Sequence, residues 1–219
     1  MLAMMLLMIC VSAGAQTAFA KVDAKEMEAW MNDHKETYDS LLTRFCNADS
    51  LTVPELYRLY YGYVFTDKYQ ALYSEDKATV EAYKTDAKAA YEAYKKEFEK
   101  NPIFLRTLYR LILLSDYLKH ETEMQKYLLQ FRMLVAAIRE TGNATQLAPM
   151  YVINVPDEYM LIELLFGDFE LQSQALNGET TAGLCDVMKC KMEEDGSINT
   201  YWFNVSLYMT AMERQLSAK

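Results

Sequence analysis

Residues 103–118, with the sequence IFLRTLYRLILLSDYL, are apolar on nearly every side of a helix. A helix that is apolar all round is typical of a protein interior. Asn101 and Pro102 come directly before it, and Pro is favoured at the first helical position. The sequence therefore predicts a central buried helix that starts at Pro102.

The neighbouring segments show the spacing of amphipathic helices. Residues 23–45 and 74–98 carry apolar side chains in steps of three and four, and Ser74 is a good N-cap for the second segment. The same steps recur in residues 124–138, and Gly142 is a typical residue for a helix end. These segments predict paired antiparallel helices.

The best-specified helix start is Thr52-Val-Pro-Glu55. In this capping box the Thr52 and Glu55 side chains each bond the backbone amide of the other residue. Leu51 and Leu56 occupy the two positions of a hydrophobic staple around it.

The last third of the chain changes its pattern. Residues 150–155 are rich in β-branched side chains, and residues 158–166 fit a strand or a helix. Residues 185–193 and 198–207 flank an Asp-Gly turn, which favours a β-hairpin. We therefore predict a small antiparallel sheet in this part.

The expected fold class is α+β. An array of antiparallel helix pairs, residues 21–148, packs against the antiparallel β-rich part, residues 149–219, in one compact domain.

Residues 1–20 have the pattern of a cleaved secretory signal peptide. An apolar run, MLAMMLLMICV, is followed by two Ala-x-Ala steps that end at Ala15 and Ala20. A membrane anchor is the weaker interpretation, because about 15 apolar or small residues fall short of the roughly 20 that a spanning helix needs. No Lys or Arg precedes the run, which an upstream start would explain. We expect a periplasmic or secreted protein, cleaved after Ala15 or Ala20.

The composition narrows the possible partners. The formal net charge is −9, which disfavours nucleic acid and, after signal cleavage, a membrane surface. The mature part keeps Cys46, Cys185 and Cys190. We expect buried free thiols, because Cys185 and Cys190 would face opposite sides of a strand; a bridge from Cys46 stays open.

Tyrosine is the unusual residue, since Tyr57, Tyr60, Tyr61 and Tyr63 fall within seven positions that include Gly62. They cannot all face one core. One interpretation is amphipathic packing, in which each hydroxyl finds a polar partner. The alternative is an aromatic wall, in which Tyr57 and Tyr61 pair four residues apart and stay partly exposed while Tyr63 is buried.

A second candidate binding site is Asp157-Glu158, after Pro156. Two adjacent carboxylates at the start of a strand could receive a cation or a partner's Lys or Arg; a solvated turn is the alternative. The chain has no nucleophile motif, metal-ligand spacing or nucleotide-binding glycine pattern. We therefore expect no catalytic residue, no cofactor and no metal.

Several short motifs suggest a family. They are Tyr60-Tyr61-Gly62, Thr141-Gly142, Tyr151-Val-Ile, Asp157-Glu158-Tyr159, Gln172-Ser-Gln174 and Tyr201-Trp-Phe-Asn-Val205. In this order the chain resembles, over roughly residues 35–208, exported proteins of Bacteroides-type bacteria known only as a domain of unknown function. The resemblance implies tetratricopeptide-like helices and no assigned activity. That family favours Gly-Asp-Gly where this chain has Gly142-Asn143-Ala144.

The sequence therefore favours a non-enzymatic domain that binds or scaffolds another envelope protein or a peptide. The alternative is a small-ligand or glycan-binding module that uses the Tyr-rich helix.

Overall fold

The computed structural model describes residues 19–72 and 75–217. The predicted signal peptide, residues 1–20, lies outside the described residues except for its last two positions. The helices are α2 (Ala24–Asp33), α3 (Lys35–Cys46), α4 (Val53–Gly62), α5 (Lys77–Thr85), α6 (Ala87–Lys100), α7 (Leu105–Tyr117), α8 (Glu121–Arg139), α9 (Val155–Phe166) and α10 (Ser206–Ser217), with a 3-10 turn η1 (Tyr63–Phe65). The strands are β1 (Met150–Tyr151), β2 (Phe169–Thr180), β3 (Gly183–Met192) and β4 (Ile198–Asn204).

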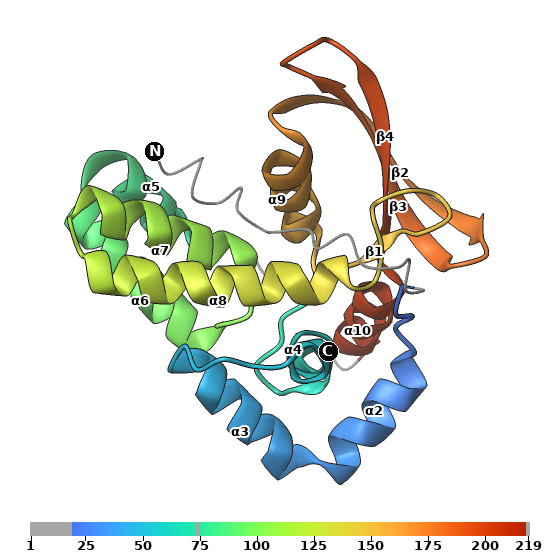
Figure 1. The fold of residues 1–219 in the computed structure, drawn as a ribbon, viewed down its shortest axis with the longest axis horizontal. Helices are drawn as coiled ribbons and strands as arrows, with labels where there is room; N and C mark the ends of the chain where they lie inside the picture. Colours follow the sequence, from blue (N-terminus) through green and yellow to red (C-terminus); the bar gives the residue numbers. More distant parts are fainter. Residues whose placement is uncertain (1–18, 73–74, 218–219) are drawn as a thin grey trace.

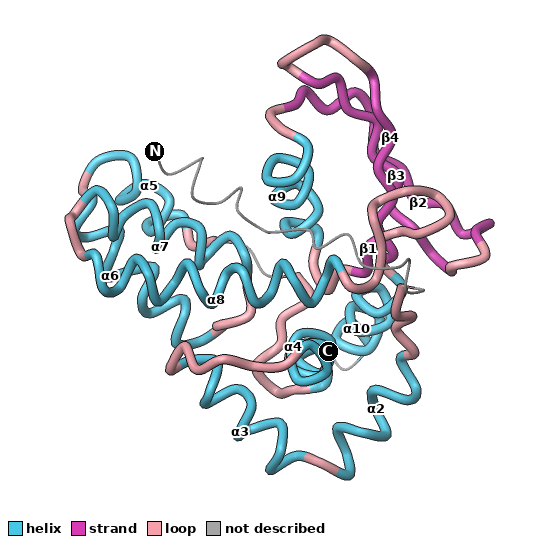
Figure 2. Tube along the Cα trace, in the orientation of Figure 1, coloured by secondary structure: helices cyan, strands magenta, loops and turns pink. Residues whose placement is uncertain are grey.

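Helices α2 to α8 precede the sheet along the chain, and the sheet stands to one side of them (Figures 1 and 2). This arrangement confirms the α+β class. Helix α7 packs on α6, α8 and α9, and its Leu105, Leu108 and Leu111 side chains are fully buried. The predicted central helix is therefore confirmed, although it begins at Leu105 and Pro102 lies in the turn before it.

Two predicted long helices are each broken into two. Residues 23–45 bend at His34, whose φ of −129° and ψ of 34° are not helical. The second segment breaks at Asp86, whose carboxylate accepts hydrogen bonds from the amides of Lys88 and Ala89, both at 3.0 Å. Asp86 is therefore the N-cap of α6, and it interrupts an otherwise continuous apolar pattern. Helix α5 is capped by Asp76, and the predicted cap Ser74 lies outside the described residues.

The capping box at Thr52 is confirmed. The Thr52 amide donates to the Glu55 carboxylate at 2.7 Å, and the Thr52 hydroxyl donates to the same oxygen at 2.9 Å. Arg44 of α3 donates to the other Glu55 oxygen at 2.6 Å. The Thr52 amide first, and then Arg44, lower the pKa of Glu55 to about 2.

The sheet has the order β1-β4-β3-β2. Strands β3 and β4 form the predicted hairpin, with Met188 opposite Tyr201. The prediction of a purely antiparallel sheet is wrong, because β1 runs parallel to β4, with Met150 opposite Phe203. The long edge strand β2 was not predicted, since its sequence is mostly polar.

The strand predicted at residues 150–155 ends at Tyr151, because the chain turns into α9. The Asn154 side chain accepts from the Asp157 amide at 3.1 Å and caps the helix, and Pro156 follows in its first turn. Residues 158–166 are therefore helical. Similarly, the strand expected to reach residue 207 ends at Asn204, and Ser206 begins α10.

Gly142 follows α8, which ends at Arg139. A Cβ atom at Gly142 would lie 2.3 Å from the Pro149 carbonyl oxygen and 2.5 Å from that of Ala148. This glycine therefore permits a close approach of two backbone segments.

The three cysteines of the described chain are free thiols. Cys185 and Cys190 are buried, as predicted, and Cys46 is partly buried. A disulfide bond from Cys46, which the sequence left as an alternative, is not present among the described residues.

Replacing Thr52 tests the helix start. Thr52→Ala removes half of the capping box, and we expect the free energy of unfolding to fall by about 1 kcal/mol, the usual effect of a lost N-cap. Thr43→Ala is the control, because this exposed hydroxyl bonds the Asp39 carbonyl within α3, where Ala is the better helix former. Urea denaturation measures both; equal stabilities would contradict the assignment.

Candidate functional site

The four clustered tyrosines divide into three buried rings and one accessible ring. Tyr60, Tyr61 and Tyr63 are completely buried, and Tyr57 is half-buried. The predictions for Tyr57 and Tyr63 are confirmed, and that for Tyr61 is wrong. Tyr57 and Tyr61 do pair, with ring centroids 5.0 Å apart.

Tyr61 is buried because its hydroxyl has a partner in the core. It donates to the Tyr151 carbonyl at 2.9 Å, and the Tyr69 hydroxyl donates to the Ile153 carbonyl at 2.5 Å. Residues 152–154 are buried but lie outside every strand of the sheet. Buried carbonyls need hydrogen-bond donors, and tyrosine side chains supply them here.

A third buried tyrosine hydroxyl, that of Tyr60, donates to the Asp157 side chain instead of a backbone carbonyl. Its hydroxyl donates to the Asp157 carboxylate at 2.5 Å, and the Asn154 amide nitrogen donates to the same oxygen at 2.8 Å. Asp157 was expected at the start of a strand or in a solvated turn. It instead lies fully buried in the first turn of α9, because the asparagine cap folds the chain inward there.

Burial is the main influence on the pKa of Asp157. It raises this pKa to about 7, while the hydrogen bonds from Tyr60 and Asn154 act in the opposite direction. The Leu105 backbone amide and the charge of Arg106, at the start of α7, also lower it. Asp157 therefore takes up or loses its proton near neutral pH.

Glu158 is also buried, and it faces a second acid, Asp186 of β3. The Gln174 amide nitrogen lies 2.5 Å from Asp186 and 3.4 Å from Glu158, and the Tyr159 hydroxyl donates to Gln174 at 2.5 Å. Burial, followed by the charge of Asp186, raises the pKa of Glu158 well above its ordinary value. Burial of the site and the nearby Asp186 carboxyl therefore both favour the protonated form of Glu158.

Asp186 was missed by the sequence analysis. It stands two positions before Met188 and four before Cys190 in β3, on the face of the strand that packs inward. An acid in phase with buried apolar residues was the signal that could have revealed it.

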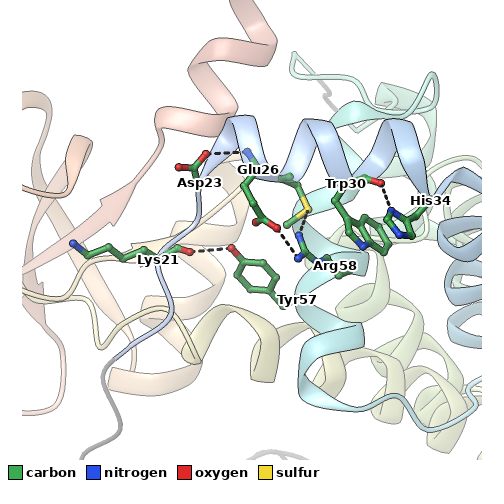
Figure 3. Close-up of polar contacts among 8 residues, drawn as sticks. Lys21, Asp23, Glu26, Trp30, His34, Tyr57 and Arg58 are labelled. Atoms are coloured by element: carbon green, nitrogen blue, oxygen red, sulfur yellow. Dashed lines mark hydrogen bonds and ion pairs between the residues drawn. The ribbon is translucent and has the colours of Figure 1, made fainter.

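A different surface surrounds Tyr57, on α2 and α4 (Figure 3). The Arg58 guanidinium lies 5.0 Å from the Trp30 ring centroid and 5.8 Å from that of Tyr57. Arg58 also donates to Glu26 at 2.6 Å. The His34 ring stacks on Trp30, with centroids 5.1 Å apart and planes at 6°.

The N-terminal segment closes one side of this surface. The Tyr57 hydroxyl donates to the Lys21 carbonyl at 2.9 Å, and the Asp23 carboxylate caps α2 by accepting from the Glu26 amide at 2.9 Å. The two groups of predicted site residues are therefore separate. Asp157 and Glu158 belong to a buried network, and Tyr57 belongs to a partly exposed aromatic and cationic cluster.

The network and the cluster differ in what they can do. In residues 19–72 and 75–217, no three His, Cys, Asp or Glu side chains are grouped so that they could hold a metal. No helix of these ranges has both the length and the apolar character needed to cross a membrane. The buried acids can exchange protons, and the cluster on α2 and α4 can contact another molecule.

The structure is therefore an α+β domain with a helical array and a network of buried, hydrogen-bonded polar side chains. The chain belongs to the family of the domain of unknown function DUF4919, whose family model matches residues 25–214. This match confirms the resemblance to a domain of unknown function. Neither a curated protein nor a solved structure matches the chain.

The raised pKa of Glu158 makes stability depend on pH. The folded state keeps a proton on Glu158 that the unfolded state loses above about pH 4.3, so stability falls as pH rises from there towards the raised pKa. The raised pKa of Asp157 also makes stability fall as pH rises, up to about pH 7. We expect Glu158→Gln to raise the free energy of unfolding at pH 8 and to reduce its fall between pH 5.5 and pH 8, because the variant lacks the carboxyl group that the unfolded chain ionises more readily than the folded chain does.

Glu163→Gln is the matched control, because Glu163 is exposed on the same helix. Denaturation of the wild type and both variants at pH 5.5 and pH 8 provides the comparison. A Glu158→Gln variant that is less stable than wild type at pH 8 would show that Glu158 is ionised in the fold.

Proposed function

We propose that this chain is a non-enzymatic, exported protein that binds or scaffolds another envelope protein or a peptide through the surface formed by Trp30, Tyr57 and Arg58. The observation that carries the proposal is the grouping of these three side chains on α2 and α4. Tyr, Trp and Arg are the residue types that dominate the energy of protein interfaces.

The geometry of the cluster supports this role. Arg58 is held by Glu26 and by the Trp30 ring, so little of its conformational freedom remains to be lost on binding. Its side chain is still 25% exposed. A preorganised planar guanidinium beside two aromatic rings suits a peptide carboxylate or carbonyl.

The absence of catalysis is part of the proposal. The acids Asp157, Glu158 and Asp186 are all buried, and side chains of the fold itself, Tyr60 and Gln174, donate hydrogen bonds to them. The net charge of −9 supports a partner other than nucleic acid.

The alternative proposal is a small-ligand or glycan-binding module. It has less support, because most of the clustered tyrosines that it would use are buried. Of the four clustered tyrosines, Tyr57 alone is accessible, and Trp30 is the other ring that a sugar could stack upon. Binding of soluble envelope polysaccharide that requires Trp30, in the absence of any protein partner, would favour this alternative.

Export is tested by the mass of the mature protein. If the first twenty residues form a cleaved signal, intact-mass measurement on envelope-fraction protein should find a chain that begins near Gln16 or Lys21. A full-length chain confined to the cytosol would contradict export.

Binding is tested with Arg58→Lys, which keeps the charge and loses the planar fork. We expect this variant and Tyr57→Ala to weaken retention of the envelope partner by about 1 to 2 kcal/mol, or roughly 5- to 30-fold, as at other interface positions. Quantitative pulldown from envelope extract provides the measurement. Tyr117→Ala is the control, because this ring is 73% exposed on α7, away from the cluster. Equal retention by all variants would exclude the surface.

A further inference from the structure

Strand β2 is an open edge of the sheet. It pairs with β3 on one side, and no other strand of the described residues pairs with its second side. Nearly every residue along it is exposed. In an edge strand, backbone N–H and C=O groups of alternate residues point outward without a strand partner.

The middle of this edge lacks the usual protection against pairing. Natural edge strands carry Lys, Pro, inward-pointing charges or β-bulges that block a further strand. Residues 171–178, LQSQALNG, contain no charge and no Pro, and Leu176 is 55% exposed. Register shifts between Leu171 and Ser173 and between Asn177 and Thr180 bracket a regular run of residues 173–177.

The charges lie at the two ends of the open edge and have the same sign. Glu170 and Glu179 are both exposed, and Lys191 lies opposite Glu170 on the protected side, in β3. If two copies paired antiparallel through this edge, the Glu170 end of each strand would lie near the Glu179 end of the other, with no cation of the strand between them. Like charges brought close together destabilise a strand pair, so the edge disfavours its own copy.

We propose that β2 is a strand-addition site for an extended segment of another protein with Lys or Arg at its two ends, about 30 Å apart. The segment would continue the sheet beyond β2 through main-chain hydrogen bonds. Its terminal cations would face Glu170 and Glu179. This site is separate from the α2–α4 surface of the proposed function, so either can fail without the other.

The first test uses a defined probe and the full mature chain. The probe is a fluorescent ten-residue peptide of alternating Thr and Val with Lys at both ends, compared with the same peptide ending in Glu. We expect fluorescence polarisation to show about tenfold tighter binding of the Lys-ended peptide, because two end pairs change from repulsive to attractive. The Glu170→Lys, Glu179→Lys double variant should reverse the preference.

A charge-matched control keeps the test specific. Glu99→Lys with Glu213→Lys changes two exposed acids on α6 and α10, and it should leave the preference unchanged. The proposal is overturned if neither peptide binds, if both bind equally, or if the control variant also loses the preference. Circular dichroism confirms that each variant is folded.

A second variant tests the edge without any peptide. Glu179→Lys alone makes the edge self-complementary in charge, because the Glu170 end of each copy would then lie near the new lysine of the other copy. Sedimentation equilibrium at low salt should show about tenfold stronger self-association than in wild type or in Glu213→Lys. The proposal requires this result as well; unchanged self-association would overturn it.

Discussion

The hydrogen bonds from buried tyrosine hydroxyls to residues 151–157 are the constraint on which the rest of the structure depends. Tyr60, Tyr61 and Tyr69 reach across more than eighty positions of sequence to Asp157, Tyr151 and Ile153. The segment they reach is buried without a complete set of strand partners. Each missing bond would leave a buried polar group unpaired, at a cost of about 1 to 3 kcal/mol.

This constraint explains why the chain uses tyrosine where a core would ordinarily use Phe or Leu. The ring supplies apolar contact to the helices, and the hydroxyl supplies the donor that the buried segment lacks. It also explains why α9 can begin with buried acids. Asp157 is tolerated because Tyr60 and Asn154 donate to it, and Glu158 because it can hold a proton beside Asp186.

Much of the fold could be predicted from local pattern. The central helix at 103–118, the helix around residues 124–138 and the hairpin at 185–207 all carry a strong periodicity or a turn motif. The breaks at His34 and Asp86 were missed because a polar residue that caps a helix can stand within an unbroken apolar pattern. Strand β2 was missed because an exposed edge strand needs little apolar alternation.

The candidate site was harder to predict, because burial of a polar side chain depends on distant partners. The exposure of Tyr57 follows from its position on the helix, but the burial of Tyr61 depends on a carbonyl ninety residues away. Asp157 and Glu158 were singled out as a candidate binding site and wrongly placed at the surface, since both are buried. The Arg58 and Trp30 contact could not be foreseen, since it joins two helices whose packing was unknown.

The tyrosine bonds have one more consequence, which concerns how the chain can be divided. The donors lie in the helical part and their acceptors in the stretch that leads into α9 and the sheet, so a cut near residue 148 would strip both pieces of their partners. The helical part and the stretch that leads into the sheet therefore depend on each other for buried hydrogen bonds, and the family match over residues 25–214 covers both of them.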